Sequence, residues 1–152
     1  MKLQAIAILT FLIFENVMAQ ETTTAKYINS TDMEALKLTQ EWDKTFPQSD
    51  KVEHTKITFH NRYGITLAAD LYKPKNTQGR LAAIAVSGPY GAVKEQVSGR
   101  YAQTLAERGF LTIAFDPSYY GESGGTPRYL TSPEISTEDF SAAVDYLTSL
   151  SL

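Results

Sequence analysis

The segment YYGESGGTPR at residues 119–128 contains residue types and a spacing that could supply a catalytic nucleophile. Within it, Gly121-Glu122-Ser123-Gly124-Gly125 matches the pattern G-x-S-x-G. In that pattern a serine hydroxyl projects from a sharp turn between a strand and a helix, where it can attack an acyl carbon. Whether Ser123 is such a nucleophile depends on the elements on either side of it and on a base that could take its proton.

The surroundings of Ser123 do not favour the nucleophile hypothesis. The preceding apolar run ends at Asp116 and is followed by Pro117, so no strand leads directly into the serine, and Gly-Gly-Thr-Pro-Arg cannot open a helix after it. The only histidines, His54 and His60, precede Ser123, whereas this arrangement requires the acid and then the histidine to follow it. A trypsin-like arrangement would need two β-barrels, and this chain alternates helices with buried strands. We therefore predict that Ser123 is a structural residue of a glycine-rich loop.

The amino-acid composition excludes several other kinds of partner and site. The 152 residues carry a net charge of −3 without a Lys/Arg cluster, which indicates neither a nucleic-acid partner nor binding to an anionic membrane. The absence of cysteine excludes a disulfide scaffold and thiolate metal sites. We find no metal-ligand spacing and no dinucleotide-binding pattern, so we expect neither a metal nor a cofactor. His54 and His60 are interpreted as residues of an amphipathic strand without a carboxylate pattern around them.

The beginning of the chain has the features of an export signal. Met1-Lys2 is followed by an apolar run over residues 3–14, and Val17-Met18-Ala19 offers a cleavage site. The run is shorter than the roughly 20 apolar residues that span a bilayer. We predict a signal peptide over residues 1–19, and therefore a secreted or periplasmic protein without a membrane segment after cleavage.

Residues 20–50 are predicted to form a lead-in with one helix. Thr31-Asp32-Met33-Glu34 matches a capping box, and the helix is expected to end near Phe46, before Pro47.

Residues 51–152 are predicted to form an α/β domain. Two runs with a period of two are joined by a turn at residues 61–64 and predict an antiparallel hairpin. A strand–helix–strand unit follows, with a parallel pair of buried strands, and then a last helix. The expected elements are strands over 52–59, 65–72, 81–87 and 110–115, a helix over 96–108 and a helix from 136.

Finer expectations concern the two helices of this domain. In the first, Val97, Tyr101 and Leu105 form an apolar stripe and are predicted to face the core. In the second, Ser136 and Asp139 are predicted to cap the start.

Four ordered segments carry a resemblance to a known family: ITFHNRYGITLAADLYKP, AVSGPYGAVKEQ, YAQTLAERGFLTIAFDPSYYGESGG and DFSAAVDYL. Together they resemble the N-terminal half of bacterial α/β-hydrolases, in the branch similar to dienelactone hydrolases and X-Pro dipeptidyl-peptidases. The resemblance covers about residues 52–150. It implies acyl transfer through a serine on the turn after strand five. That position would lie beyond Leu152, so the nucleophile, acid and base are expected not to be in this chain.

The resemblance also identifies one candidate site residue. The loop GPYGAVKEQ stands where relatives often have H-P-G-G-G or H-G-x, which implies that the backbone N–H of Tyr90 serves in the oxyanion hole. Pro89 has no N–H, and Gly88 replaces the usual histidine. The alternative is an ordinary strand-to-helix turn. The DPSYYGESGG segment resembles the structural loop after strand four, where Tyr119 and Tyr120 either pack or line a substrate pocket.

Two functional hypotheses remain open from the sequence. The first is the N-terminal part of a secreted serine α/β-hydrolase that acts on a small-molecule ester or peptide when completed. The second is a non-catalytic truncated product, or a part that pairs with a separate C-terminal piece. Either way, a chain that stops before strand five is expected to leave the apolar strand 81–87 with an open edge. We therefore predict that the mature chain is marginally stable or self-associates through this edge.

Overall fold

The structure is a computed structural model, and it describes residues 36–150. The predicted signal peptide, residues 1–19, and the capping box lie outside the described residues and stay predictions. No helix in the described part of the chain is long and apolar enough to cross a membrane. The elements are β1 (Val52–His60), β2 (Thr66–Pro74), β3 (Ala83–Val86), α2 (Val97–Ala106), β4 (Leu111–Phe115) and α3 (Pro133–Ser149).

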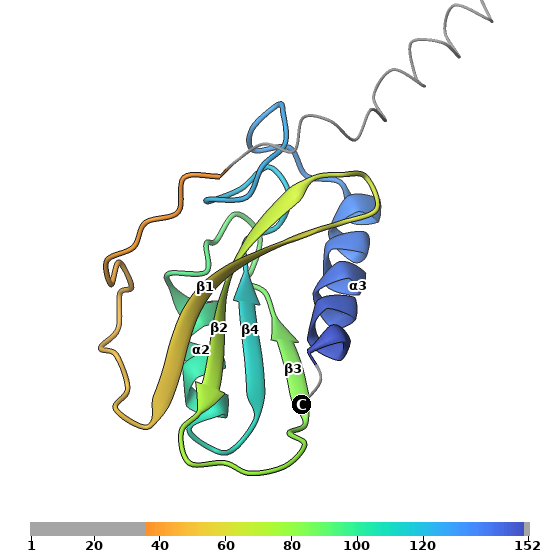
Figure 1. The fold of residues 1–152 in the computed structure, drawn as a ribbon. Helices are drawn as coiled ribbons and strands as arrows, with labels where there is room; N and C mark the ends of the chain where they lie inside the picture. Colours follow the sequence, from red (N-terminus) through yellow and green to blue (C-terminus); the bar gives the residue numbers. More distant parts are fainter. Residues whose placement is uncertain (1–35, 151–152) are drawn as a thin grey trace, which may run out of the picture. The chain divides into compact units, whose positions relative to one another are not determined.

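The strands form one mixed sheet in the order β1-β2-β4-β3 (Figure 1). β1 and β2 are an antiparallel hairpin, in which Val52 lies opposite Pro74 and His60 opposite Thr66. β2 also pairs with β4 antiparallel, whereas β3 and β4 are parallel. Gly64 adopts a φ of 74°, a left-handed conformation that glycine adopts readily, and closes the hairpin turn. The predicted α/β fold, an antiparallel hairpin followed by β-α-β-α, is confirmed.

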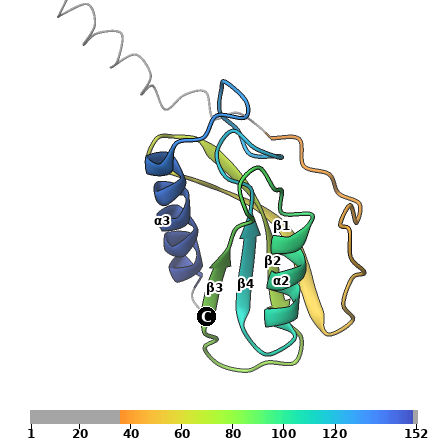
Figure 2. The ribbon, with the colours of Figure 1, turned by 180° about the vertical axis from the view of Figure 1, so that it is seen from behind.

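The two helices cover opposite faces of the sheet. Figure 1 shows α3 on one face, and the view from behind in Figure 2 shows α2 on the other. Each face has its own apolar core, because side chains alternate between the two faces along a strand. The core under α3 contains Phe59, Leu67, Ala69, Leu111, Ile113, Phe115, Ala142, Ala143 and Leu147, and the core under α2 contains Phe46, Val52, Tyr72, Ala102, Ala106 and Ala114.

β3 differs from the prediction of a strand buried on both faces. β4 has a neighbour on each side and is buried throughout, but β3 pairs only with β4 and is exposed or half-buried at every residue. The apolar run predicted the strand correctly. Its burial depends on a second neighbour, which the described residues do not supply.

The buried face of α2 was predicted wrongly. The Val97 and Tyr101 side chains are 66% and 62% exposed, whereas the buried residues of this helix are small or polar. A Cβ atom at Gly99 would lie 2.2 Å from the Lys94 backbone oxygen and 3.1 Å from the Phe46 ring. Because α2 packs this closely against its neighbours, only a face of small or polar side chains fits there, and the larger Val97 and Tyr101 side chains point outward.

The start of α3 is also corrected. The helix begins at Pro133 rather than near Ser136, and the Ser132 hydroxyl accepts a hydrogen bond from the Ile135 amide at 3.4 Å. Proline at the first helical position favours this start, because its missing N–H would have no partner there. Asp139 is not a cap. Its buried carboxylate accepts hydrogen bonds from Asn61 and Ser118 and so links α3 to two loops.

The helix predicted to end near Phe46 is absent from residues 36–49, the described part of the lead-in. This segment is irregular, and Trp42, Lys44 and Phe46 alternate toward the interior as half-buried or buried residues. The Trp42 ring N–H donates to the Phe46 carbonyl at 2.7 Å, and the Thr45 amide donates to the Glu95 carbonyl at 3.0 Å. A helix would place residues i and i+2 on different faces, so burial of this alternating set outweighs the helical pattern.

Candidate active site

Two loops meet beyond the carboxyl ends of β3 and β4. Because these strands are parallel, the loop over residues 87–96 and the loop over residues 116–132 leave the sheet at the same end. Ligands of open α/β sheets bind in this region. It is therefore the candidate site.

Tyr90 lies at the tip of the first loop, and its side chain is 82% exposed. The loop turns back through a hydrogen bond from the Ala92 amide to the Pro89 carbonyl, 2.9 Å long, and Gly91 has a φ of 76°. Among the described residues, no hydrogen bond uses the Tyr90 amide. The Tyr90 N–H is thus a free donor within this part of the chain. The role implied by the resemblance stays a prediction.

Ser123 lies in the second loop and is 2% exposed. Its Oγ donates to the Asp116 carbonyl at 2.7 Å and accepts from the Ala68 amide at 2.9 Å. The hydroxyl thus bridges the loop and β2, and neither histidine is among its partners. This geometry agrees with the prediction that Ser123 is structural.

The second loop is a tight glycine loop around the Asp116 carboxylate. Gly121 has a φ of 52°, and a Cβ atom there would lie 2.1 Å from an Asp116 oxygen. A Cβ atom at Gly125 would lie 2.6 Å from the buried Tyr119 ring. The Tyr120 hydroxyl lies 2.6 Å from Thr131 Oγ1. Both tyrosines therefore make contacts within the loop, as expected of packing residues.

Asp116 connects the two loops. One carboxylate oxygen accepts from the Lys94 amide at 2.7 Å, and the other accepts from the Lys94 ammonium group at 2.8 Å and from the Glu122 amide at 2.9 Å. Asp116 and Lys94 are both fully buried. Charge-assisted hydrogen bonds of this kind are stronger than neutral ones, and they fix the loops relative to each other.

The Lys94 ammonium group contacts two further carboxylates, those of Glu95 and Glu122. Burial alone would lower the pKa of Lys94, but the charge of Asp116 and the hydrogen bonds to all three carboxylates raise it above its ordinary value. The pKa of Glu95 is also raised, but there burial and the nearby Asp116 charge disfavour the charged form and outweigh the hydrogen bond from Lys94. Lys94 is therefore held as a buried cation at the junction of both loops.

Glu122 connects this cluster to Thr39 in the lead-in. Its carboxylate accepts from the Lys56 ammonium group at 2.8 Å and from the Thr39 amide at 2.7 Å, besides Lys94. Burial acts to raise the pKa of Glu122, but the hydrogen bonds from Lys56 and Lys94 outweigh it and lower the pKa to about 2. Asp43 behaves alike: burial opposes its ionisation, and hydrogen bonds from Lys44 and Lys56 lower its pKa to about 2.

A second part of the network surrounds Asp70 on β2. The Lys44 ammonium group lies 3.1 Å and the His54 ring nitrogen 2.7 Å from the same Asp70 oxygen. The other Asp70 oxygen and the Tyr72 hydroxyl are buried without a partner among residues 36–150. Burial and the Asp70 charge raise the pKa of Tyr72. The contact between His54 and Asp70 corrects the interpretation that no carboxylate surrounds the histidines. Asp70 lies 16 residues after His54, and only the hairpin register brings them together.

Carboxylate oxygens of Asp43, Glu95 and Glu122 lie within 4.8 Å of one another, a spacing that could hold a metal ion. Lysine ammonium groups already bind all three carboxylates, namely Lys56 at Asp43 and Glu122, and Lys94 at Glu95 and Glu122. Sequence spacing could not have revealed this cluster, because its members come from three distant segments.

The fold and the two loops define the class of protein. The structure superposes on the α/β-hydrolase GrgF from a Penicillium species with a TM-score of 0.57 at 24% identity, covering 64% of this chain and 33% of that one. The architecture is that of an α/β-hydrolase. The model of the X-Pro dipeptidyl-peptidase (S15) family matches residues 63–151, more than half of the chain. The chain belongs to this family.

Two relatives add detail. The Pseudomonas aeruginosa protein PA2218 is 69% identical over 129 residues, which are 84% of this chain and 34% of that protein. Its crystal structure matches with a TM-score of 0.76 at 71% identity, over 78% of this chain and 37% of that one. The Butyrivibrio proteoclasticus protein Est1E, solved with bound ferulic acid, matches with a TM-score of 0.54 at 26% identity, over 62% and 37%. The chain thus spans about a third of the length of the relatives it matches.

Proposed function

We propose that this chain forms the oxyanion-side part of a serine hydrolase that transfers acyl groups from small-molecule esters or peptides. Membership of the family and the likeness to Est1E support this class of reaction. One observation carries the proposal: a free backbone donor, the Tyr90 N–H, lies at the carboxyl end of the sheet in a loop anchored through Lys94 to the buried Asp116.

In such a reaction a serine oxygen attacks the acyl carbon, and the carbonyl oxygen acquires the negative charge of a tetrahedral intermediate. The Tyr90 N–H would donate to that oxygen. Because an anchored donor needs no reorganisation when the charge develops, it lowers the barrier more than a mobile one. Ser123 takes no part, since its hydroxyl is engaged on both sides by backbone groups. The nucleophile, acid and base would come from a further segment.

We also propose that the protein is exported. The apolar run over residues 3–14 and the small residues ending at Ala19 support a cleaved signal. Expression in a bacterial host followed by N-terminal sequencing of the periplasmic product tests it. A mature chain beginning at Gln20 is expected, and a cytoplasmic product that retains Met1 would contradict export.

The oxyanion role is tested in a chimera of this chain and the C-terminal two-thirds of the Pseudomonas aeruginosa relative, assayed with aryl esters. Tyr90→Pro removes the backbone N–H, and Tyr90→Ala removes the side chain and keeps the donor. We expect Tyr90→Pro to lower kcat by about 10²- to 10³-fold, the usual loss for one oxyanion donor, and Tyr90→Ala to leave kcat within a few-fold. Equal losses in both variants would contradict the backbone role.

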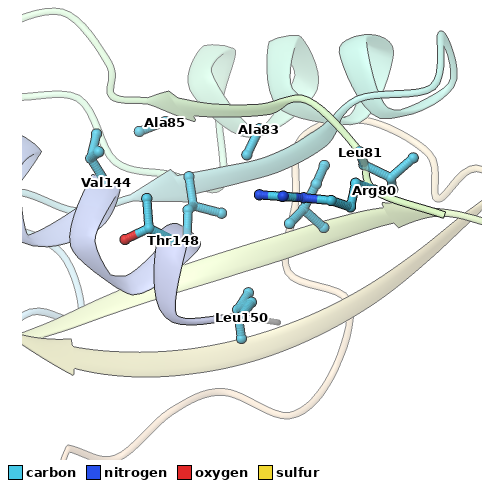
Figure 3. A pocket seen from close by; sticks show the side chains of 9 residues that line it. Arg80, Leu81, Ala83, Ala85, Val144, Thr148 and Leu150 are labelled. Carbon is cyan, nitrogen blue, oxygen red and sulfur yellow. The ribbon is translucent and has the colours of Figure 1, made fainter. Parts of the chain in front are cut away.

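A second candidate function is a part that pairs with a separate C-terminal piece. The open edge of β3 and the apolar groove beside it favour this possibility (Figure 3). Mixing the chain with a separately produced C-terminal piece of the same relative tests it. Aryl-ester hydrolysis that appears only in the mixture would support pairing, and inactivity of a mixture whose covalent chimera is active would exclude it.

A further inference from the structure

Lys94 occupies an unusual position, because it holds Asp116 by both its backbone and its side chain. The Lys94 amide binds one Asp116 oxygen at 2.7 Å, and the Lys94 ammonium group binds the other at 2.8 Å. The side chain is fully buried and bears a charge that three carboxylates surround. Two points of attachment fix both the position and the direction of the chain at residue 94.

This attachment lies four residues after Tyr90. Between them the loop contains one internal hydrogen bond, from the Ala92 amide to the Pro89 carbonyl, and Gly91 in a left-handed conformation. The loop begins at the half-buried end of β3. Lys94 is the first residue of the loop that is charged and fully buried. The placement of the Tyr90 amide therefore depends on that anchor.

A half-buried lysine of the same cluster provides a contrast. Lys56 lies on β1, binds Glu122 and Asp43, and makes no contact with Asp116 within the described residues. It shares the carboxylate of Glu122 with Lys94 and lies 3.8 Å from the Glu95 carboxylate, but it has no backbone attachment to the loop.

We propose that Lys94 is a positioning residue, whose double attachment to Asp116 sets the conformation of the loop over residues 88–93 and thereby the placement of the Tyr90 amide. The inference deepens the proposed function and rests on it for its catalytic meaning. The attachment itself concerns only residues of this chain.

The test compares Lys94→Met with Lys56→Met in the full chain by hydrogen-exchange mass spectrometry. Each variant removes one cation from the same cluster and keeps a side chain of similar length. Peptides over residues 88–95 report the Ala92 and Lys94 amides, and peptides over β4 report opening of the whole fold. We expect Lys94→Met to speed exchange in the loop about tenfold more than in β4, since it removes a charge-assisted hydrogen bond. Lys56→Met should change both regions alike.

Exchange that rises equally in loop and β4 for Lys94→Met, or a loop loosened equally by Lys56→Met, would overturn the proposal. If Lys94→Met does not fold, Glu122→Gln decides. It keeps the shape of the side chain and weakens one of the three carboxylate contacts of the Lys94 ammonium group. It also weakens the Lys56 contact, for which Lys56→Met is the control. We therefore expect a smaller increase that is still confined to the loop. An increase shared with β4, or none, would overturn the proposal. Exchange reports the attachment and the ester assay reports the oxyanion role, so either can fail without the other.

Discussion

The charged cluster beyond β4 and the groove beside β3 lie in one domain but differ in whether their side chains have partners. In the cluster, the buried carboxylate of Asp116 and the half-buried carboxylate of Glu122 are matched by ammonium groups and backbone amides at hydrogen-bonding distance. The groove has a volume of about 230 Å³, and most of its lining side chains are apolar, with the Arg80 guanidinium and the Thr148 hydroxyl among them (Figure 3). It is lined by Arg80, Leu81, Ala83, Ala85, Leu111, Val144, Leu147, Thr148 and Leu150.

The difference shows in which region the described residues supply their own partners. Charged groups leave water only when they are paired, so the cluster must be satisfied within the chain, and within residues 36–150 it largely is. The edge of β3, with the groove beside it, can remain exposed at a smaller cost, because water still solvates the unpaired backbone groups of that edge. We therefore expect changes in the cluster to affect stability, and changes at the edge to affect association.

The largest expected effect is at the centre of the cluster. Asp116→Asn keeps the shape of the side chain but removes the charge that faces buried Lys94, and should lower the free energy of unfolding by about 3–5 kcal/mol. The matched control Asp145→Asn changes an exposed carboxylate and should lie within about 0.5 kcal/mol of the parent. Urea denaturation followed by circular dichroism measures both free energies of unfolding. Similar values for the two variants would contradict the expected difference between cluster and surface.

A smaller loss is expected at Ser123. Ser123→Ala leaves the Ala68 amide and the Asp116 carbonyl buried without their partner, and should cost about 1–3 kcal/mol. The same variant should not change the reaction of the protein with a fluorophosphonate probe for active serines. Labelling of the parent chain that disappears in Ser123→Ala would show that the hydroxyl is a nucleophile after all.

The acid dependence of stability follows from Glu122 and Asp43. The pKa of each is lowered to about 2 in the folded chain, below the ordinary values of 4.5 and 3.8. Groups whose pKa is depressed by folding bind fewer protons in the native state. Their stabilisation is complete above about pH 4.5 and is lost as the pH falls toward about 2. Thermal melts between pH 6 and pH 2, over the window these values define, should show a steeper loss for the parent than for Glu122→Gln, and parallel curves would exclude this role.

The smallest effect on stability is expected at the strand edge. Ala83 is exposed on β3, and a lysine there discourages pairing between strand edges. We expect the parent chain to self-associate through residues 81–87 and Ala83→Lys to shift it toward the monomer, with little change in the free energy of unfolding. Sedimentation velocity over a range of concentrations measures this. A monomeric parent would remove the proposed association.

Much of the fold could be predicted because local patterns and tertiary demands agree. Alternating residues and a left-handed Gly64 specify the hairpin, and the apolar run before Asp116 specifies the central strand β4. The buried, hydrogen-bonded position of Ser123 agrees with the predicted structural role, and that prediction was possible because a nucleophile needs flanking elements that the sequence around it does not provide.

The errors arose where packing overrides pattern. The stripe of Val97 and Tyr101 faces outward because Gly99 allows α2 to approach its neighbours closely. The lead-in matches a helical pattern, but residues 36–49 are irregular and turn Lys44 and Phe46 inward. The charged cluster could not be predicted at all, because it joins Asp43, Lys94 and Glu122 from three separate segments.

The sequence by itself determined the order of the elements from residue 52 onward, the parallel pairing of β3 with β4 and the loop that carries Tyr90. These follow from periodicity, turn residues and motif order, which are local properties. Only the tertiary structure decided that Lys94 and Asp116 join the two loops, that Asp70 meets His54, and which face of α2 is buried. The physical reason is that charge pairing and close packing depend on distances between segments far apart in the chain, and local patterns do not contain those distances.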